Sequence, residues 1–375
     1  MSGVCKVCGN PLFGAPLLDY PNMPGVAQHL PDTQTVAEDR GFDLEIRQCS
    51  GCGLVQIASE PVPYFREVIR AVAVSEEMTA FRSAQFRRFV EEWKLEGKKL
   101  LEVGCGRGEY LALWKEAGAD SYGLEWNEDA VRCCRERGLK AQRGYLETVE
   151  TRVAAAPFAA FAILSFFEHV PRPNALLRAI SGNLAEGGVG IVEVPNFDMI
   201  LRARLFAEFM RDHLCYFTRR TLATALELNG FEVVRIEEIW HEYILSAVVR
   251  KREPLDLAEF RGHQERLRRD VEQFLGRHAK VAVWGAGHQA LAILALLGLG
   301  GRIRYVVDSA SFKQGKLTPA SHIPIVAPRA LHSDPVDAIL IMAGSYADEV
   351  REQVRKMHGE SMRVAVLREW GIEEA

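Results

Sequence analysis

The sequence lacks any apolar stretch long enough to cross a membrane. A membrane-spanning helix needs about 20 consecutive apolar residues, and the longest apolar stretch, residues 290–300, falls well short of that length. Its length favours a buried helix instead. The first residues also lack the charged and then apolar segment that marks an export signal. These absences predict a cytoplasmic protein with no membrane partner.

A strong net charge is also missing. The 46 basic and 50 acidic residues leave a formal net charge of −4, whereas proteins that bind nucleic acids usually present a basic field. The one basic cluster, residues 261–269, is interrupted by Glu265 and Leu267, which is typical of a solvated helix face or linker. Nucleic acid is therefore not expected as a partner.

The sequence contains no low-complexity segment and no short repeat, so its composition is that of a globular protein. Its 375 residues exceed what a single ordinary core organises and predict two or three domains. It has eight cysteines. In a reducing compartment these are expected to be free thiols or metal ligands rather than disulfides.

Strand and helix patterns alternate through most of the chain. A helix is expected over 78–93, and the alternation that follows comprises strands over 99–103, 121–124, 161–165, 190–194, 231–237 and 246–250, with helices over 110–117, 130–137, 175–184 and 221–229. Such alternation predicts a parallel sheet covered on both faces. A charged helical connector is expected over 255–276, and a second alternation starts with a strand over 280–284. It predicts a second, smaller α/β unit.

A glycine-rich loop follows the strand expected over 99–103. Gly104, Gly106 and Gly108 have the spacing G-x-G-x-G, whereas the dinucleotide fingerprint is G-x-G-x-x-G. Glycines here let the backbone turn tightly and let a ligand lie against main-chain N–H groups. Glu102 would repel a phosphate and suits a ligand with a cationic amino group. A site for NAD or a nucleotide phosphate is the less favoured alternative.

The next strand ends at Glu125, whose carboxylate can accept hydrogen bonds from two ribose hydroxyls. Together with the glycine loop, this acid resembles the class I S-adenosylmethionine-dependent methyltransferases over residues 97–250. The resemblance implies that the glycines approach the methionine part, that Glu125 holds the ribose and that residues 144–146 flank the adenine. The implied cofactor residues are Glu102, Gly104, Cys105, Gly106, Gly108, Glu125, Trp126, Gly144, Tyr145, Leu146 and Ser165. Residues 165–170 resemble the family's loop beside the methyl donor. His169 in this loop is either part of that site or a structural residue that caps the following turn, and the second interpretation is slightly favoured.

Two Cys-x-x-Cys pairs near the start of the chain predict a metal site. Their members are Cys5, Cys8, Cys49 and Cys52. Four thiolates satisfy tetrahedral Zn²⁺, and because they fill every coordination position, the metal is expected to be structural. A redox pair is the less favoured alternative.

The third part of the chain contains the pattern G-x-G-x-x-A after a strand, with an acid at the end of the next strand. A four-cysteine module, a central methyltransferase and this α/β unit together resemble the nucleotide-sugar C-methyltransferases. The sequence segments most specific to this family are Cys-Gly-Leu-Val-Gln at 52–56, Lys-Gln-Gly at 313–315 and Ile-Pro-Ile at 323–325. The resemblance implies that the last unit binds the nucleotide part of a sugar through Gly285, Gly287, His288, Gln289, Asp308 and Lys313.

Such enzymes methylate carbon beside a ketone, which requires a base and stabilisation of the enolate oxygen. The family's Tyr-x-Glu-His segment matches residues 210–213, so His213 is the implied base and Asp212 stands where the family has glutamate. Met210 replaces the family's tyrosine, and Tyr216 is the candidate for part of its role. Oxygen methylation of a hydroxyl remains an alternative with the same base.

The sequence thus predicts an α/β protein with a zinc-binding module over 1–65, a class I Rossmann-like methyltransferase domain over 66–252, and a connector with a smaller Rossmann-like domain over 253–375. Its expected partner is a small, nucleotide-linked substrate. Three rival hypotheses remain: an RNA methyltransferase, a fusion whose last unit uses NAD, and a binding protein without activity.

Overall fold

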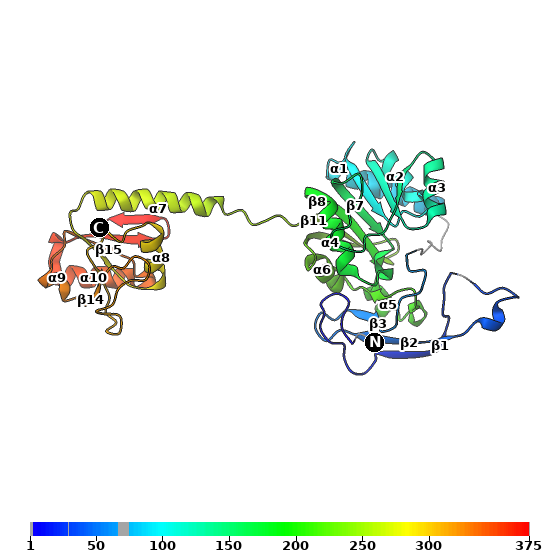
Figure 1. Cartoon of the computed structure of the whole chain (residues 1–375), viewed down its shortest axis with the longest axis horizontal. Coiled ribbons are helices and arrows are strands. Elements are labelled where there is room, and N and C mark those ends of the chain that lie inside the picture. Colours follow the sequence, from blue (N-terminus) through cyan, green and yellow to red (C-terminus); the bar gives the residue numbers. More distant parts are fainter. Residues whose placement is uncertain (1–2, 29, 67–74, 375) are drawn as a thin grey trace. The chain divides into compact units, whose positions relative to one another are not determined.

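The computed structural model describes residues 3–28, 30–66 and 75–374 (Figure 1). The chain forms two compact units, Met1–Pro254 and Leu255–Ala375. None of the helices within the described ranges combines the length and the apolar character that crossing a bilayer requires.

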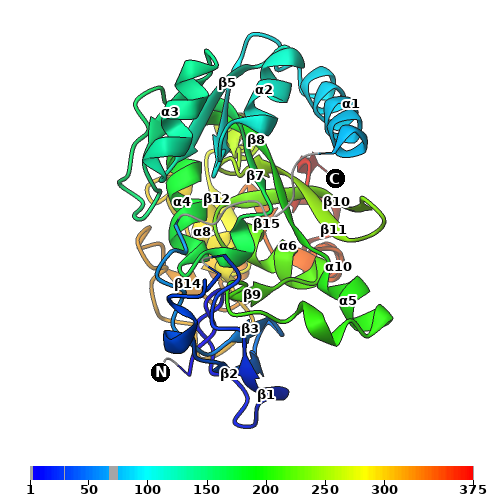
Figure 2. The same cartoon turned by 90° about the vertical axis from the view of Figure 1, so that its right-hand side faces the viewer.

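The first unit is built on a mostly parallel sheet with strand order β10-β11-β8-β7-β4-β5-β6. Figure 2 labels β5, β7, β8, β10 and β11 of this sheet. The strands of the sheet are β4 (Lys99–Val103), β5 (Asp120–Glu125), β6 (Lys140–Arg143), β7 (Phe158–Leu164), β8 (Leu184–Pro195), β10 (Phe231–Ile239) and β11 (Ile244–Lys251). From β6 to β8 the order is that of a Rossmann-type sheet, and β11 joins β8 in antiparallel pairing. This topology confirms the predicted α/β class. The order reverses between β4 and β7, so a ligand crevice is expected at their carboxyl ends.

Helices cover both faces of this sheet because neighbouring strand residues point in opposite directions. Leu100 of β4 belongs to the buried cluster that includes Phe86 and Trp114, and the next residue, Leu101, belongs to the separate cluster that includes Leu177. The helices of this unit are α1 (Glu76–Glu92), α2 (Glu109–Glu116), α3 (Glu128–Glu136), α4 (Pro173–Asn183), α5 (Phe197–Ala203) and α6 (Arg219–Glu227). The rings of Phe86 and Trp114 are stacked with their centroids 3.7 Å apart.

A small antiparallel sheet with strand order β1-β2-β3-β9 precedes the large one in the chain. Its strands are β1 (Leu18–Met23), β2 (Phe42–Gln48), β3 (Val55–Ile57) and β9 (Cys215–Tyr216). Strand β9 lies about 160 residues after β3 in the sequence. Its Tyr216 pairs with Val55 of β3, and its Cys215 pairs with Gln56. The buried side chains of the small sheet share one core with α4, α6 and the large sheet. The small sheet and the large sheet are therefore packed as one body.

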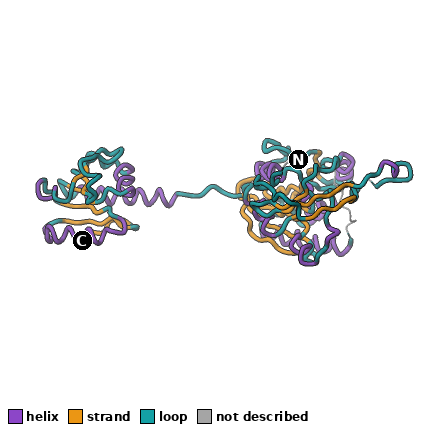
Figure 3. The backbone as a smooth tube through the Cα atoms, turned by 90° about the horizontal axis from the view of Figure 1, so that it is seen from below, coloured by secondary structure: helices purple, strands orange, loops and turns teal. Residues whose placement is uncertain are grey.

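The second unit has a sheet of strand order β14-β13-β12-β15-β16-β17. Figure 3 distinguishes the strands of the chain from its helices by colour. The strands of this unit are β12 (Val281–Trp284), β13 (Val306–Val307), β14 (Ile325–Val326), β15 (Ala338–Ile341), β16 (Arg363–Arg368) and β17 (Gly371–Glu374), and its helices are α7 (Ala258–Gly276), α8 (His288–Leu296), α9 (Ala330–Ser333) and α10 (Ala347–His358). β17 alone of these pairs antiparallel, so this is a second Rossmann-like sheet. The buried helix expected within 290–300 is only partly buried: α8 buries Ala290 and Leu294 but exposes 59% of Leu296, because only one of its faces meets the sheet.

Candidate functional site

The glycine loop lies between β4 and α2, at the crevice formed by the reversal of strand order. Gly104 has φ of 72°, and a Cβ placed on it would lie 3.1 Å from the ring of Phe166. A side chain at Gly104 would therefore be strained both by its backbone conformation and by lack of space. Ser165, at the end of β7, also has a positive φ of 52°. For a residue other than glycine this is unusual, and such strain is commonly found at functional sites.

Glu125 organises this loop through its buried carboxylate. Its Oε2 accepts a hydrogen bond from the backbone N–H of Gly106 at 3.0 Å, and its Oε1 accepts one from Asn127 N–H at 2.8 Å. The backbone N–H of Gly144 donates to the carbonyl of Glu125 at 2.9 Å. Glu102 is fully buried one strand away, at the end of β4. The structure thus brings together the glycine loop, Glu125 and the segment at Gly144. In the sequence, only the family resemblance connected these three parts.

A segment before α1 also reaches this region. The guanidinium of Arg66 lies 5.2 Å from the ring centroid of Trp126 and 5.3 Å from that of Tyr145, and it pairs with Glu147 at 2.7 Å. A small pocket is lined by Phe65, Tyr145, Leu146, Glu147, Pro171 and Arg172. Sequence reasoning missed Phe65 and Arg66, because nothing in their local pattern shows that they contact residues some eighty positions later.

The predicted base lies in the loop before β9, against the loop that follows β7. The ring centroids of His213 and His169 are 4.7 Å apart. Two hydrogen bonds hold the loops together: His169 Nδ1 lies 2.8 Å from the carbonyl oxygen of Asp212, and the N–H of Leu214 donates to the carbonyl of Glu168 at 2.8 Å. His213 is therefore positioned by a segment at the carboxyl edge of the sheet.

Burial and then the neighbouring His169 lower the pKa of His213 to about 3, and burial lowers the pKa of His169 to about 4. Both imidazoles are unprotonated at neutral pH and can accept a proton. Burial raises the pKa of Glu168 to about 8. The cluster is thus a group of neutral, poorly solvated side chains.

Asp212 and Tyr216 make different contacts around this base. The hydroxyl of Tyr64 lies 3.1 Å from Oδ1 of Asp212, and burial followed by the charge of Asp212 raises the pKa of Tyr64. The hydroxyl of Tyr216 is bonded to the backbone of Met210, accepting from its N–H at 2.9 Å and donating to its carbonyl at 3.1 Å. Sequence reasoning missed Tyr64. The structure places its hydroxyl beside Asp212, whereas that of Tyr216 is engaged with Met210.

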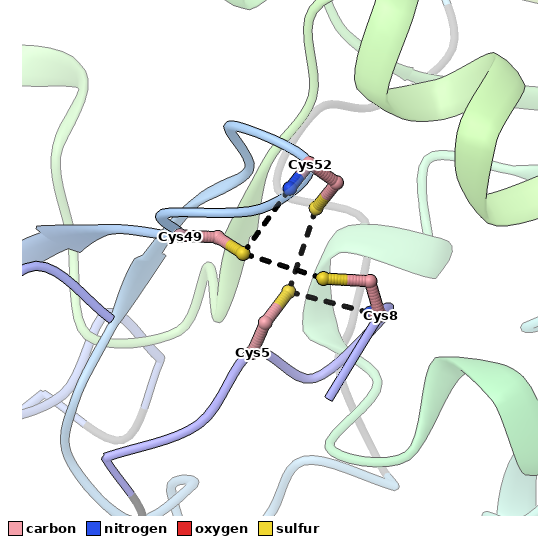
Figure 4. Close-up of side chains that lie close together, drawn as sticks. All are labelled: Cys5, Cys8, Cys49 and Cys52. Carbon is pink, nitrogen blue, oxygen red and sulfur yellow. Dashed lines mark hydrogen bonds between the residues drawn. The ribbon is translucent and has the colours of Figure 1, made fainter. Parts of the chain in front are cut away.

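The four cysteines of the two pairs converge, although about forty residues separate the pairs (Figure 4). Cys5 Sγ lies 3.6 Å from Cys52 Sγ, and Cys8 Sγ lies 3.3 Å from Cys49 Sγ. Backbone N–H groups point at the sulfurs, such as that of Cys52 at 3.4 Å from Cys49 Sγ. Tetrahedral Zn²⁺ with bonds of about 2.3 Å requires sulfurs about 3.8 Å apart. The arrangement fits that ion.

In the second unit, the glycine loop and Asp308 also come together. Gly285 has φ of 115°, and a Cβ placed on it would lie 2.6 Å from the carbonyl oxygen of Met342. Oδ2 of Asp308 accepts hydrogen bonds from Ala286 N–H at 2.9 Å and from Lys313 Nζ at 2.8 Å. Although burial raises the pKa of Asp308, Lys313 and the backbone N–H groups bring it below its usual value. Three further predicted residues lie exposed at the start of α8: Gly287, His288 and Gln289.

Comparison with known proteins assigns two parts of the chain. Residues 75–236 match the family model described as a methyltransferase domain, and residues 253–367 match the one described as a C-methyltransferase C-terminal domain. The chain is 25% identical over 381 residues to the C-methyltransferase NovU of Streptomyces niveus, covering 92% of this chain and 90% of that protein. It is 30% identical over 99 residues to the ubiquinone biosynthesis O-methyltransferase of Bordetella avium, covering 25% of this chain and 41% of that protein.

Solved structures resemble about half of the chain. An S-adenosylmethionine-dependent methyltransferase from Clostridium acetobutylicum aligns with a TM-score of 0.40 and 10% identity, covering 51% of this chain and 96% of that one. The magnesium protoporphyrin IX methyltransferase of Synechocystis aligns with a TM-score of 0.39 and 14% identity, covering 50% and 96%. The hypothesis of a binding protein without activity is wrong, because the matched families and the full-length relative are methyltransferases. The chain therefore contains a class I methyltransferase domain, matched over residues 75–236, and a C-methyltransferase C-terminal domain, matched over residues 253–367.

Proposed function

We propose that this enzyme methylates a carbon atom beside a ketone in a small sugar-like substrate that is linked to a nucleotide. The observation that supports this most is the placement of His213, unprotonated at neutral pH, at the carboxyl edge of the sheet that also bears the glycine loop. The full-length relative named as a C-methyltransferase agrees with carbon as the acceptor. The free cysteines fit a reducing compartment, and we propose the cytoplasm as the location.

The proposed reaction begins when His213 removes the proton from the carbon beside the ketone. The electron pair of that C–H bond moves to the ketone oxygen and forms an enolate, while the proton stays on the imidazole. When bound, S-adenosylmethionine would supply an electrophilic methyl group, which would form a bond to the enolate carbon as its bond to sulfur breaks, leaving S-adenosylhomocysteine. Met210 stands where the family has its tyrosine. We propose that the hydroxyl group of Tyr64, which is held by its hydrogen bond to Asp212, takes over the role of that tyrosine.

For the cofactor, we propose that Glu125 binds the ribose and that the Gly104–Gly108 loop lies against the methionine part. Replacing Glu125 by alanine is expected to weaken binding of S-adenosylhomocysteine by about 10- to 100-fold, because hydrogen bonds to a charged group contribute about 1.5–3 kcal/mol each. Isothermal titration calorimetry measures the change. Glu128→Ala is the matched control, since Glu128 lies three residues later with 72% of its side chain exposed. Equal affinities of the two variants would remove Glu125 from the cofactor site.

We propose that Cys5, Cys8, Cys49 and Cys52 hold a structural Zn²⁺. Four thiolates would fill its coordination sphere and leave no position for substrate. The metal would stabilise the turns at both Cys-x-x-Cys pairs and would take no part in the methyl transfer.

For the second unit, we propose that Gly285, Gly287, His288, Gln289, Asp308 and Lys313 bind the nucleotide. The N–H groups at the start of α8 favour an anionic group, and Lys313 supplies a cation beside the loop. The contact between Lys313 and Asp308 must loosen if Asp308 is to accept hydrogen bonds from a ribose.

A thermal-shift panel tests the nucleotide proposal, with S-adenosylhomocysteine present in every sample. Thymidine, uridine, guanosine and cytidine diphosphates are compared with NAD. One diphosphate is expected to raise the melting temperature more than the others, because ligand binding to the native state stabilises it. Lys313→Ala should reduce that shift. A shift with NAD alone would favour the fusion hypothesis, and no shift with any nucleotide would contradict the proposed substrate class.

A second candidate function is methylation of a hydroxyl oxygen. Met210, which stands where the C-methylating family has tyrosine, favours it, because a hydroxyl substrate forms no enolate that would need stabilisation. His213 would remove the hydroxyl proton directly. Retention of deuterium at the carbon beside the ketone during turnover would favour this second function over the first.

A further inference from the structure

We propose that Glu168, His169 and His213 form a second metal site, distinct from the four thiolates, for one divalent transition-metal ion. One oxygen and two nitrogen atoms, one from each side chain, all lie within 4.8 Å of one another. The binding of the ion is independent of the proposed function. Its consequence for catalysis rests on that function, because His213 is the proposed base.

The distances suit a metal ion after small adjustments of the side chains. Glu168 Oε1 lies 3.8 Å from His169 Nε2. Zn²⁺ bonds of about 2.0–2.1 Å place tetrahedral ligand atoms about 3.4 Å apart, and opposite ligands in an octahedral site about 4.1 Å apart. Shifts on the order of 1 Å at the ends of the side chains would therefore bring all three atoms into coordination.

The hydrogen bond made by His169 fixes which of its nitrogens is available. Its Nδ1 lies 2.8 Å from the carbonyl oxygen of Asp212. A carbonyl can only accept, so Nδ1 bears the proton and Nε2 presents its lone pair toward Glu168. A ligating histidine commonly has its second nitrogen held in this way by a carbonyl or carboxylate, which orients the ring.

Glu168 supplies a second, independent indication of a ligand. Its side chain is 3% exposed, and its Oε2 is buried with no hydrogen-bond partner among the residues that the structure describes. A buried polar atom without a partner costs free energy. A cation between Glu168 and the two imidazoles would satisfy this oxygen.

The ligand set selects the class of ion. Two imidazoles and one carboxylate suit Zn²⁺, Co²⁺, Ni²⁺ or Fe²⁺, whereas Mg²⁺ and Ca²⁺ prefer oxygen ligands. His213 is the half-buried member of the three, so the ion would enter from its side and keep coordination positions open there. An ion bound to His213 would occupy the lone pair that accepts the substrate proton, and the occupied enzyme would be unable to use this base.

Titration with Co²⁺ tests the site in full-length protein that contains one Zn²⁺ per chain, bound by the four thiolates, so that the second site is left open for Co²⁺. Wild-type protein is expected to bind one Co²⁺ per chain with visible d–d absorption and without thiolate charge-transfer bands. Glu168→Gln and His169→Gln should each weaken this binding by about tenfold or more, in line with the sensitivity of metal sites to their supporting groups.

His241→Gln is the matched control, because the side chain of His241 is 76% exposed and lies outside the cluster. Unchanged affinity for S-adenosylhomocysteine in each variant shows that the fold is retained. Three results would overturn the inference: no Co²⁺ bound beyond the thiolate site, equal affinity in Glu168→Gln and wild type, or a spectrum dominated by thiolate charge transfer. Because none of these measurements needs turnover, they are independent of whether His213 proves to be the base.

Discussion

Replacing His213 by alanine is expected to lower kcat for methyl transfer by about 10²- to 10⁴-fold, the range that a general base contributes. His213 is held against His169, and because burial lowers its pKa, its imidazole is unprotonated at neutral pH and carries a lone pair that can accept a proton. No interaction joins it to Glu125 or to the glycine loop within the ranges described by the structure, so affinity for S-adenosylhomocysteine should stay nearly the same. Single-turnover kinetics and calorimetry measure the two quantities.

Three further variants serve as comparisons for this result. His241→Ala removes an exposed imidazole from the same unit and should leave kcat unchanged. Tyr64→Phe should lower kcat more than Tyr216→Phe, because Tyr64 contacts Asp212 while the hydroxyl of Tyr216 is bonded to Met210. Full turnover by His213→Ala would remove His213 from the mechanism and leave the methyl transfer without an identified base.

Replacing Cys49 by serine is expected to release the metal from the thiolate site and to lower kcat strongly, although no cysteine of this site contacts the substrate in the proposed mechanism. Structural Zn²⁺ sites in small domains contribute about 10–16 kcal/mol of binding free energy to folding. Cys49 directly follows β2, and its N–H donates to the carbonyl of Leu54, next to β3. Strand β3 in turn pairs with β9, and Ile57 N–H donates to the carbonyl of Leu214, one residue after His213. Loss of the metal should therefore displace the proposed base.

The expected signature is a loss of bound zinc, faster proteolysis within residues 3–66 and a fall in kcat, with a smaller change in affinity for S-adenosylhomocysteine. Zinc content by mass spectrometry, limited proteolysis and kinetics measure these effects. Cys133→Ser is the control, because Cys133 is a half-buried thiol outside the cluster. Normal kcat in zinc-free Cys49→Ser would show that the small sheet positions His213 without a metal.

Most of the large sheet could be predicted because most of its strands are local apolar patterns, but β6 (Lys140–Arg143) was missed, since its short sequence is largely polar and no residue in it is fully buried. Phe158–Leu164 is a continuous apolar run, as expected for a strand buried on both faces. The small sheet could not be predicted in the same way. Its strand β3 has three residues, and one of its partners, β9, lies about 160 residues later in the chain. The failed prediction for α8 has a similar cause, since its apolar residues surround the helix and the sequence does not show which of them meet the sheet.

The candidate site shows the same division between local and distant information. Glu102, Glu125 and the glycines lie within two strands and their loops, so their spacing was informative. Tyr64 and Arg66 could not be predicted as site residues, because only their contacts with the distant residues Asp212 and Glu147 place them at the site. His169 was interpreted as a turn-capping residue. The structure places its ring against His213 and its Nδ1 on the carbonyl of Asp212, a geometry that no local pattern indicates.

The pairing of β3 with β9 also affects how the chain folds while it is being synthesised. The four thiolates are all present once residue 52 has been made, yet the edge of β3 has no partner until residues 215 and 216 follow. Loops that close over such a distance form slowly, and an unpaired strand edge invites association with other chains. A nascent or truncated chain that ends before β9 would expose this edge, so the first sixty residues would behave as an unfinished structure even with their metal bound.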